Sequence, residues 1–277
     1  MASNNLRIIY QNWADTATSI VASTTAGSTT TANLKLDTKS KVWRSTGVTS
    51  ETLTVTFPTA KIVGGVILPF CNLTSTARIT VRNGGPSGTI IANNILACPY
   101  QSLGNWDWGS LPLGVNAYSY GGGTYARVWF TVQSATILHI TITNTDNPAG
   151  YIECSRLIIG SYWSPQYNTS FGIGVGSKDL STHERTESGD LVSNRGVRYN
   201  SMTFDLKWLT ATDRLQFTSI LRGGGLPSPL FISLFPDNSE DYSQEQTYQI
   251  YGKFPQLSEI SHPIFGMYST QIEIEEI

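Results

Sequence analysis

The stretch "GYIECSRLIIG", residues 150–160, separates two parts of the chain that have different sequence patterns. It is mostly apolar and is therefore expected to be buried, although Glu153 and Arg156 interrupt the apolar residues. The segment that follows, "SYWSPQYNTSFG", has no periodicity that would predict a helix or a strand. We interpret residues 150–160 as the last strand of an N-terminal β-domain, in which Glu153 and Arg156 are structural polar positions.

Three segments upstream alternate apolar and polar residues, which predicts strands with one buried and one solvated face. They are "LTVTF" (53–57), "ARITVRN" (77–83) and "LHITIT" (138–143). The segment "KIVGGVILPF" (61–70) is continuously apolar, as expected for a strand that is covered on both sides. The glycine-rich stretches "NGGPSG" and "YGGG" supply turns between them. Several short strands separated by turns predict a β-sandwich of the jelly-roll type.

The pattern changes downstream of this domain. Residues 161–200 are rich in glycine and charged residues and show little alternation, so we expect an irregular arm or loop there. Long loops without regular structure are uncommon in compact domains unless they bind something. The clearest alternation in the chain follows in "SMTFDLKWL", which predicts a strand. Its apolar face comprises Met202, Phe204, Leu206 and Trp208.

The next segment, "TATDRLQFTSILRGGG", carries the signals of an α-helix. Thr210 is suited to the N-cap, with Asp213 three residues later, and Gly223 is suited to the first position after the helix. The expected apolar face consists of Leu215, Phe217, Ile220 and Leu221. Three further segments, "PLFISLFPD", "YQIYGKF" and "YSTQIEIEEI", predict strands.

Together these patterns predict a mainly β protein with two domains. Residues 1–160 are expected to form a β-sandwich. Residues 161–277 are expected to form a second β-rich domain with one α-helix, in which 161–200 is the arm or loop.

The composition excludes several classes of protein. Charged residues make up 14% of the chain and the net charge is −2, so there is no basic excess for binding nucleic acid. No segment is apolar enough to span a membrane, and the N-terminus lacks the features of a signal peptide, so we expect synthesis in a cytosol. The three cysteines, Cys71, Cys98 and Cys154, are predicted to be small buried residues, not a disulfide framework or a metal site.

The densest aromatic cluster surrounds "NWDWG", residues 105–109. Aromatic rings on a loop can stack on sugar rings, and nearby polar side chains can bind hydroxyl groups. The candidate carbohydrate-binding residues are Trp106, Asp107, Trp108, Tyr118, Tyr120 and Tyr125. The alternative is that these rings close one end of the sandwich or pack on a neighbouring subunit, because aromatic residues dominate cores and interfaces.

A second cluster, "HERTESGD" at 183–190, contains the residue types of acid–base catalysis. No second histidine lies near it, and the chain contains no GxSxG or HExxH motif. We therefore interpret it as a charged segment that forms ion pairs across a subunit contact. The candidate interface residues are Arg185, Glu187, Arg195 and Arg198. We expect no catalytic residues, no metal and no cofactor.

Several motifs taken together resemble a known group of proteins. The N-terminal ones are "VWRS", "VGGVILPFCNLTSTARITVRN" and "NPAGYIECSRLIIGSYWSPQYN". They resemble the discoidin-like (galactose-binding-like) jelly-roll domains of bacteriophage tail proteins. The C-terminal motifs "RGVRYNSMTFDLKWLTATD", "LPSPLFISLFPD", "YGKF" and "SHPIFGMYSTQIEIEEI" are similar to the same proteins. The C-terminal part also resembles the belt domain of distal-tail or baseplate proteins.

This resemblance implies a structural component of a phage tail tip or baseplate, located in the virion after synthesis in the host cytoplasm. It implies a homo-oligomeric ring, with a hexamer favoured and a trimer as the alternative, and contacts with other tail proteins. The sandwich would be an outward carbohydrate-binding-like module. Two alternatives remain open: a tail adhesin that binds a glycan of the host surface, and a polysaccharide hydrolase. The resemblance transfers no catalytic residue, because a fold does not determine a function.

Overall fold

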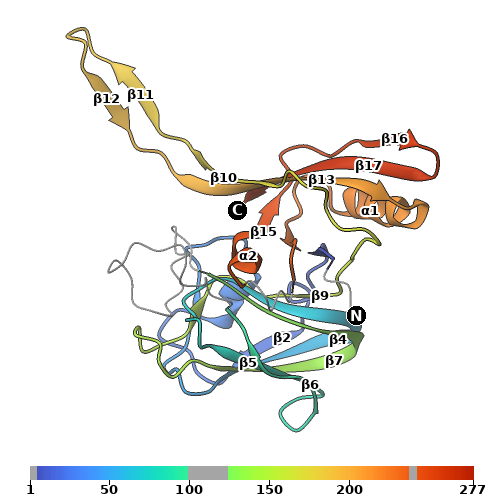
Figure 1. Ribbon diagram of the computed structural model, residues 1–277. Coiled ribbons are helices and arrows are strands. Elements are labelled where there is room, and N and C mark those ends of the chain that lie inside the picture. The colour runs from blue at the N-terminus through green and yellow to red at the C-terminus, as the bar shows by residue number, and fades with distance from the viewer. Residues whose placement is uncertain (1–4, 99–123, 237–241) are drawn as a thin grey trace.

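The computed structural model describes residues 5–98, 124–236 and 242–277, and within them the chain is mainly β, as predicted. The strands form two large sheets and a separate hairpin. Figure 1 shows the N-terminal sandwich below, the second sheet above it and the hairpin extending away from both.

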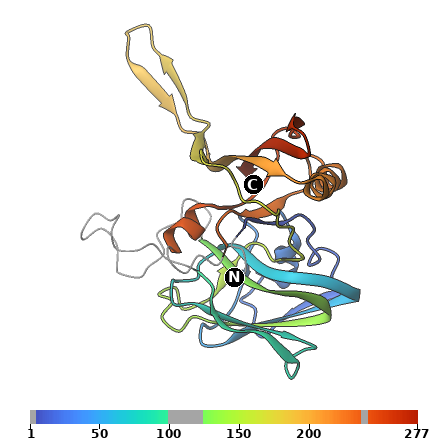
Figure 2. The ribbon, with the colours of Figure 1, turned by 45° about the vertical axis from the view of Figure 1, so that its right-hand side comes forward.

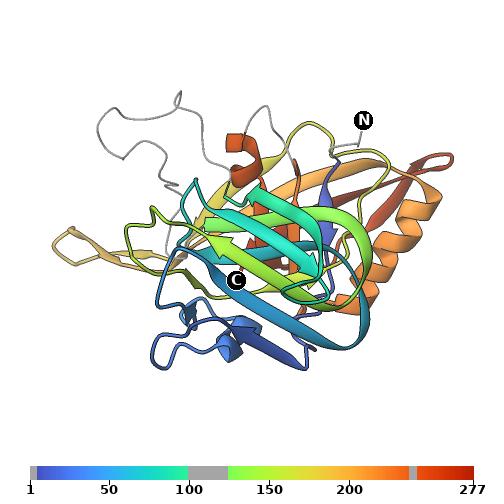
Figure 3. The same ribbon diagram turned by 90° about the horizontal axis from the view of Figure 1, so that it is seen from below.

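The N-terminal sandwich is an eight-stranded sheet in the order β3-β8-β4-β7-β5-β6, with β2 and β9 also paired to β4. Its members are β2 (Ser19–Ala22), β3 (Trp43–Arg44), β4 (Glu51–Cys71), β5 (Arg78–Asn83), β6 (Thr89–Leu96), β7 (Thr124–Thr143), β8 (Glu153–Cys154) and β9 (Ile158–Gly160). The long strands β4 and β7 pair along most of their length, with three shifts of register. Figure 3, seen from below, shows these long strands curving across the sandwich.

The predicted strand patterns of this domain are confirmed. The apolar residues of the three alternating segments are all buried in one core: Leu53, Val55, Phe57, Ile79, Val81, Leu138, Ile140 and Ile142. The continuous apolar segment is buried from Val63 onward, as expected for a strand covered on both faces. Gly65 has a steric role there, because a Cβ at this position would lie 2.7 Å from the Trp129 ring.

The second sheet has the order β1-β14-β15-β17-β13-β10, with β16 also paired to β17. Its members are β1 (Arg7–Ile9), β10 (Gly174–Asp179), β13 (Arg198–Leu209), β14 (Leu230–Ser233), β15 (Gln249–Lys253), β16 (Ile260–Ile264) and β17 (Met267–Glu276). Its core includes Leu6 and Ile8 from the start of the chain. The chain therefore begins in this sheet, enters the sandwich, and returns after β9.

Helix α1 (Ala211–Gly224) packs against the second sheet through Phe217, Ile220 and Leu221. Thr210 and Asp213 form the expected capping box. Two details of the prediction were wrong. Leu215 is exposed, and the helix continues past the predicted end to Gly224, with Gly225 at φ +60° as its C-cap.

Three further sequence predictions differ from the structure. Trp208 is 49% exposed because a register shift between Leu206 and Leu209 gives Leu209 the buried position. The stretch 150–160 contains two short strands, β8 and β9, where a single strand was predicted. A second α-helix, α2 (Tyr242–Thr247), and a 3-10 helix (Thr31–Lys35) were not predicted.

The segment 161–200 was also wrongly predicted to be irregular. It contains β10, β11 (Thr182–Arg185), β12 (Leu191–Asn194) and the first residues of β13. No hydrophobic alternation marks these strands, because both faces of β11 and β12 are exposed to solvent.

A third apolar cluster joins the sandwich to the second sheet, and it includes Phe70, Tyr125 and Trp129 of one with Phe231 and Tyr251 of the other.

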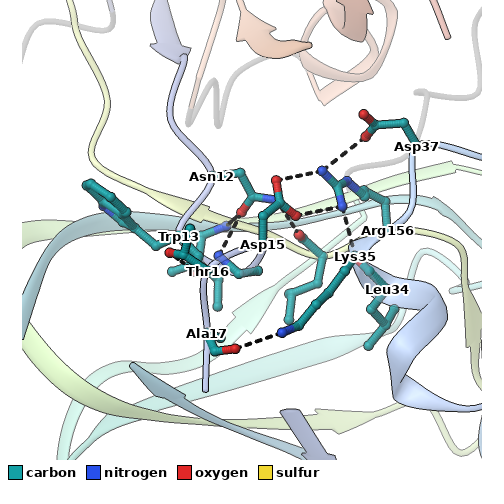
Figure 4. A network of polar contacts seen from close by, with 12 residues as sticks. Asn12, Trp13, Asp15, Thr16, Ala17, Leu34, Lys35, Asp37 and Arg156 are labelled. Carbon is teal, nitrogen blue, oxygen red and sulfur yellow. Dashed lines mark hydrogen bonds and ion pairs between the residues drawn. The ribbon is translucent and has the colours of Figure 1, made fainter. Parts of the chain in front are cut away.

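Polar side chains also join the sandwich to the second sheet. At their centre lies Arg156, which is 3% exposed (Figure 4). Its guanidinium forms ion pairs with Asp15 at 2.7 Å and Asp37 at 3.0 Å. It also donates hydrogen bonds to the Leu34 carbonyl and to the Tyr251 hydroxyl. Arg156 is thus a structural polar residue that holds the two sheets together.

Candidate functional site

The most distinctive feature of the structure is an arm formed by residues 174–203, which projects from the second sheet (Figure 2). Its base is the antiparallel pair of β10 and β13, aligned from Gly174 opposite Thr203 to Asp179 opposite Arg198. Its outer part is the hairpin of β11 and β12, which pairs only with itself among the described residues. The arm therefore reaches away from the body of the protein.

Two glycines shape the arm. At the neck between its two parts, a Cβ on Gly196 would lie 2.2 Å from the backbone of Leu180, so only glycine permits this close approach. Hydrogen bonds from the Leu180 amide to the Val197 carbonyl and from the Gly196 amide to the Ser181 hydroxyl hold the neck. At the tip, Gly189 adopts φ +90° in the turn between β11 and β12.

The arm exposes several aliphatic side chains to solvent. Four aliphatic side chains are more than half exposed: Leu180, Leu191, Val192 and Val197. An isolated two-stranded hairpin is marginally stable in water, and its unpaired edges can accept another strand. Such a surface is typical of a protein–protein contact.

Charged side chains anchor the base of the arm. Lys178 of β10 contacts Glu273, at 2.9 Å, and Glu275, both on β17. Hydrogen bonds to Glu273 and Glu275 raise the pKa of Lys178. Hydrogen bonds from Ser181, together with Arg198, lower the pKa of Asp179 to about 2. These ion pairs fasten β10 to β17 and to Arg198 of β13.

The four candidate interface residues all lie on this arm and are exposed. Arg185 donates to the Gly189 carbonyl at 2.9 Å, and Arg198 forms an ion pair with Asp179 at 2.7 Å. Glu187 lies in the tip turn, and Arg195 lies at the neck. The structure thus gathers these residues on one projecting element.

Sequence reasoning missed the aliphatic residues of the arm, although their signal was present. Leu191, Val192 and Val197 interrupt a segment that is otherwise polar and glycine-rich. Apolar residues in a segment that cannot be buried within its own domain indicate a contact surface.

The other end of the second sheet also exposes apolar residues. Ile264, the last residue of β16, is 55% exposed, and Phe265, in the turn between β16 and β17, is 98% exposed. In Figure 1 this turn lies on the opposite side of the sheet from the arm. The sheet therefore carries exposed apolar residues at two opposite ends.

A hollow of about 370 Å³ lies at the base of the arm and is lined by both polar and apolar residues, which include Ser177, Asn200, Glu276, Val175 and Met202. Glu276 joins three parts of the protein there. It accepts hydrogen bonds from the Tyr125 hydroxyl at 3.0 Å and from the Asn200 amide at 3.1 Å, and Lys39 lies 3.3 Å away. Glu276 therefore fixes the base of the arm to the sandwich.

Most of the candidate carbohydrate-binding residues, Trp106, Asp107, Trp108, Tyr118 and Tyr120, lie outside the described residues. Tyr125 is described and is 8% exposed. Its ring packs against Phe70 and Phe231 at the junction of the two sheets, with centroid distances of 5.4 and 6.0 Å. Tyr125 is therefore a junction residue, and little of its ring is available for stacking on a sugar.

Among the residues that the structure describes, no cluster of three or more His, Cys, Asp or Glu side chains is arranged to hold a metal ion. Within the same ranges, no helix is long and apolar enough to cross a membrane.

Comparisons with known proteins found no matching family model and no matching curated protein. Part of the chain is similar to solved structures. One is chitosan-binding module 1 of a chitosanase/glucanase from Paenibacillus sp. IK-5, with 16% identity and a TM-score of 0.37, covering 55% of this chain and 99% of that chain. Another is CpGH89CBM32-5 from Clostridium perfringens, in complex with GalNAc-β-1,3-galactose, with 11% identity and a TM-score of 0.37, covering 55% and 100%. Identities this low do not transfer a ligand to this chain.

Proposed function

We propose that this protein is a non-enzymatic structural subunit of a phage tail tip, which assembles into a ring by docking its arm on the next copy. The observation that carries the proposal is the arm, whose exposed aliphatic side chains have no cover within the described chain. The resemblance of the sequence to tail-tip and baseplate proteins supports the same proposal and suggests a hexamer, with a trimer as the alternative.

The two ends of the second sheet differ, so the contact between copies joins unlike surfaces. One end presents the arm, and the other presents Ile264 and Phe265. A contact between unlike surfaces repeats from copy to copy and forms a ring when the rotation between copies closes. The outer edges of β10 and β16 have no strand partner among the described residues, so they offer backbone groups for the same contact.

Removing the aliphatic surface of the arm tests this proposal. We expect the double variant Leu191→Thr/Val192→Thr to weaken self-association at least about tenfold, because association would no longer remove two exposed aliphatic side chains from water. The measurement is the molar mass in solution as a function of concentration. The matched control is Val21→Thr, an exposed strand valine of the sandwich with 59% exposure against 55% for Val192.

A second variant removes the arm itself. Replacing residues 181–196 with Asn-Gly closes β10 and β13 with a two-residue hairpin turn and leaves the rest of the sheet intact. We expect this variant to be a folded monomer. Wild-type protein that remains monomeric at high concentration, or an arm-less variant that still assembles, would refute the ring proposal.

A second candidate function is glycan binding, and it rests on the aromatic sequence "NWDWG". We expect the double variant Trp106→Ala/Trp108→Ala to assemble normally and to lose at least about tenfold in affinity for host envelope, because stacking aromatic rings carry much of such binding energy. The measurement is retention on purified envelope, with Tyr167→Ala as the exposed aromatic control. Unchanged retention would remove this candidate, and release of reducing sugar would instead indicate a hydrolase.

A further inference from the structure

Three cysteine thiols meet in the core of the sandwich although they are far apart in the sequence. Cys71 ends β4, Cys154 lies in β8, and Cys98 follows β6; all are free and buried. The sulfur atoms of Cys71 and Cys98 both contact the hydroxyl oxygen of Thr124, at 3.5 and 3.7 Å. The two thiols therefore lie beside the same hydroxyl group.

Cys98 is a better partner for Cys71 than Cys154 is. Cys71 and Cys154 face each other directly across antiparallel strands. Such positions hold the Cβ atoms about 4.5–5.5 Å apart, whereas a disulfide requires about 3.5–4.5 Å. Cys98 lies in a bend outside the strands, so its backbone can adjust more easily than that of Cys154.

The surroundings assign different chemical roles to the two neighbours. Burial raises the pKa of the Cys98 thiol well above its usual value. Burial also opposes ionisation of Cys71, but interactions with Cys98 and Thr124 outweigh it and lower the pKa of Cys71. The thiolate is the nucleophile in disulfide exchange, so Cys71 is the attacking sulfur.

We propose that Cys71 and Cys98 form a disulfide when the protein meets a disulfide oxidant such as oxidised glutathione, and that Cys154 remains free. The Cys71 thiolate attacks one sulfur of the oxidant, which forms a mixed disulfide and releases one glutathione thiolate. The Cys98 thiol loses its proton and attacks the Cys71 sulfur, which releases the second glutathione. Two thiols are oxidised and one oxidant disulfide is reduced to two thiols, so the electrons balance.

The bond ties the residue just before segment 99–123 to the end of β4. Because both thiols are buried, the oxidant can reach them only when the structure opens locally. We therefore expect slow oxidation in buffer and faster oxidation in denaturant at concentrations below the unfolding transition.

Peptide mapping tests the proposal directly, because trypsin places each cysteine on a separate peptide. The expected peptides are 62–78 with Cys71, 83–127 with Cys98 and 128–156 with Cys154. After incubation of the full chain with oxidised glutathione and alkylation of free thiols, we expect peptides 62–78 and 83–127 to be linked and 128–156 to be alkylated. Linkage of 62–78 to 128–156, or three alkylated cysteines after oxidation in denaturant, would overturn the proposal.

Two variants provide the controls. Cys154→Ala is expected to form the same linked pair, whereas Cys98→Ser is expected to form none. We also expect the oxidised wild type to melt about 5 °C or more above the reduced protein, because the disulfide lowers the conformational entropy of the unfolded chain. An oxidised protein that melts no higher than oxidised Cys98→Ser would contradict a formed bridge.

Discussion

Replacing Arg156 with leucine is expected to lower the free energy of unfolding by about 2–4 kcal/mol. Arg156 is almost fully buried and binds Asp15, Asp37 and Tyr251, which belong to both halves of the protein. Leucine supplies none of these interactions and leaves two carboxylates beside an apolar side chain. The carboxylates are about one-third exposed, so water recovers part of the loss. Urea denaturation of the two proteins gives the difference.

The matched control is Arg44→Leu. Arg44 forms an ion pair with Glu153 at 2.6 Å in the same domain, but the Arg44 side chain is 38% exposed, against 3% for Arg156. Exposed pairs contribute about 0–1 kcal/mol, so this variant is expected to lose much less stability than Arg156→Leu. Equal losses in the two variants would contradict a special contribution of the buried Arg156 network to the contact between the sandwich and the second sheet.

The pH dependence of Arg156→Leu provides a second measurement. Burial raises the pKa of Asp15 in the wild type, although Arg156 opposes this effect. Without Arg156 the pKa of Asp15 rises further. A carboxyl whose pKa is raised by folding costs stability when it is ionised, and this cost disappears as the pH falls through the folded pKa towards the unfolded value. We therefore expect the deficit of the variant to be smaller near about pH 4 than near about pH 7.

The strands of the sandwich could be predicted because each has one buried face, and burial imposes alternation on the sequence. Phe57 and Ile79 are examples of residues placed correctly by this reasoning. The helix could be predicted because its capping residues act locally. The exposure of Trp208 could not, because it depends on a shift of register against β17, and a pattern within one strand does not contain the register.

The strands of the arm, in contrast, could not be predicted from the sequence. Its strands β11 and β12 bury nothing within the described chain, so no periodic signal marks them. Its charged residues, such as Arg185 and Arg198, were predicted to form a subunit contact from residue type alone. The β-structure that presents them was not predicted, because it arises from backbone pairing and from the close approach at Gly196.

The junction between the halves illustrates why pairing partners were missed. Arg156 was recognised as a structural polar residue from its place in an apolar stretch. Its partners Asp15 and Asp37 lie more than a hundred residues away, and one sequence contains no signal that connects such positions. Tyr125 and Glu276 are likewise far apart in the sequence, so their contact could not be predicted. For this reason Tyr125 was assigned to an exposed site.

Replacing Glu245 with leucine is expected to have the largest effect of all, about 3–5 kcal/mol. The Glu245 side chain is fully buried on α2, and it accepts two hydrogen bonds from the Arg127 guanidinium on β7, both at 2.5 Å. Arg127 also donates to the Leu96 carbonyl. Leucine at this position breaks the buried ion pair with Arg127, and breaking one side of a buried pair costs more than the pair itself contributes.

A double variant distinguishes two causes of the lost stability: the broken ion pair, and the loss of the contact that attaches α2 to β7. In Arg127→Met/Glu245→Leu neither charge remains, so we expect most of the stability lost in Glu245→Leu to return. Thermal unfolding of the single and double variants measures the difference. If the double variant is as unstable as Glu245→Leu, the loss comes from detachment of α2 from the sandwich, because two apolar side chains cannot replace the bidentate contact that positions this short helix beside β7.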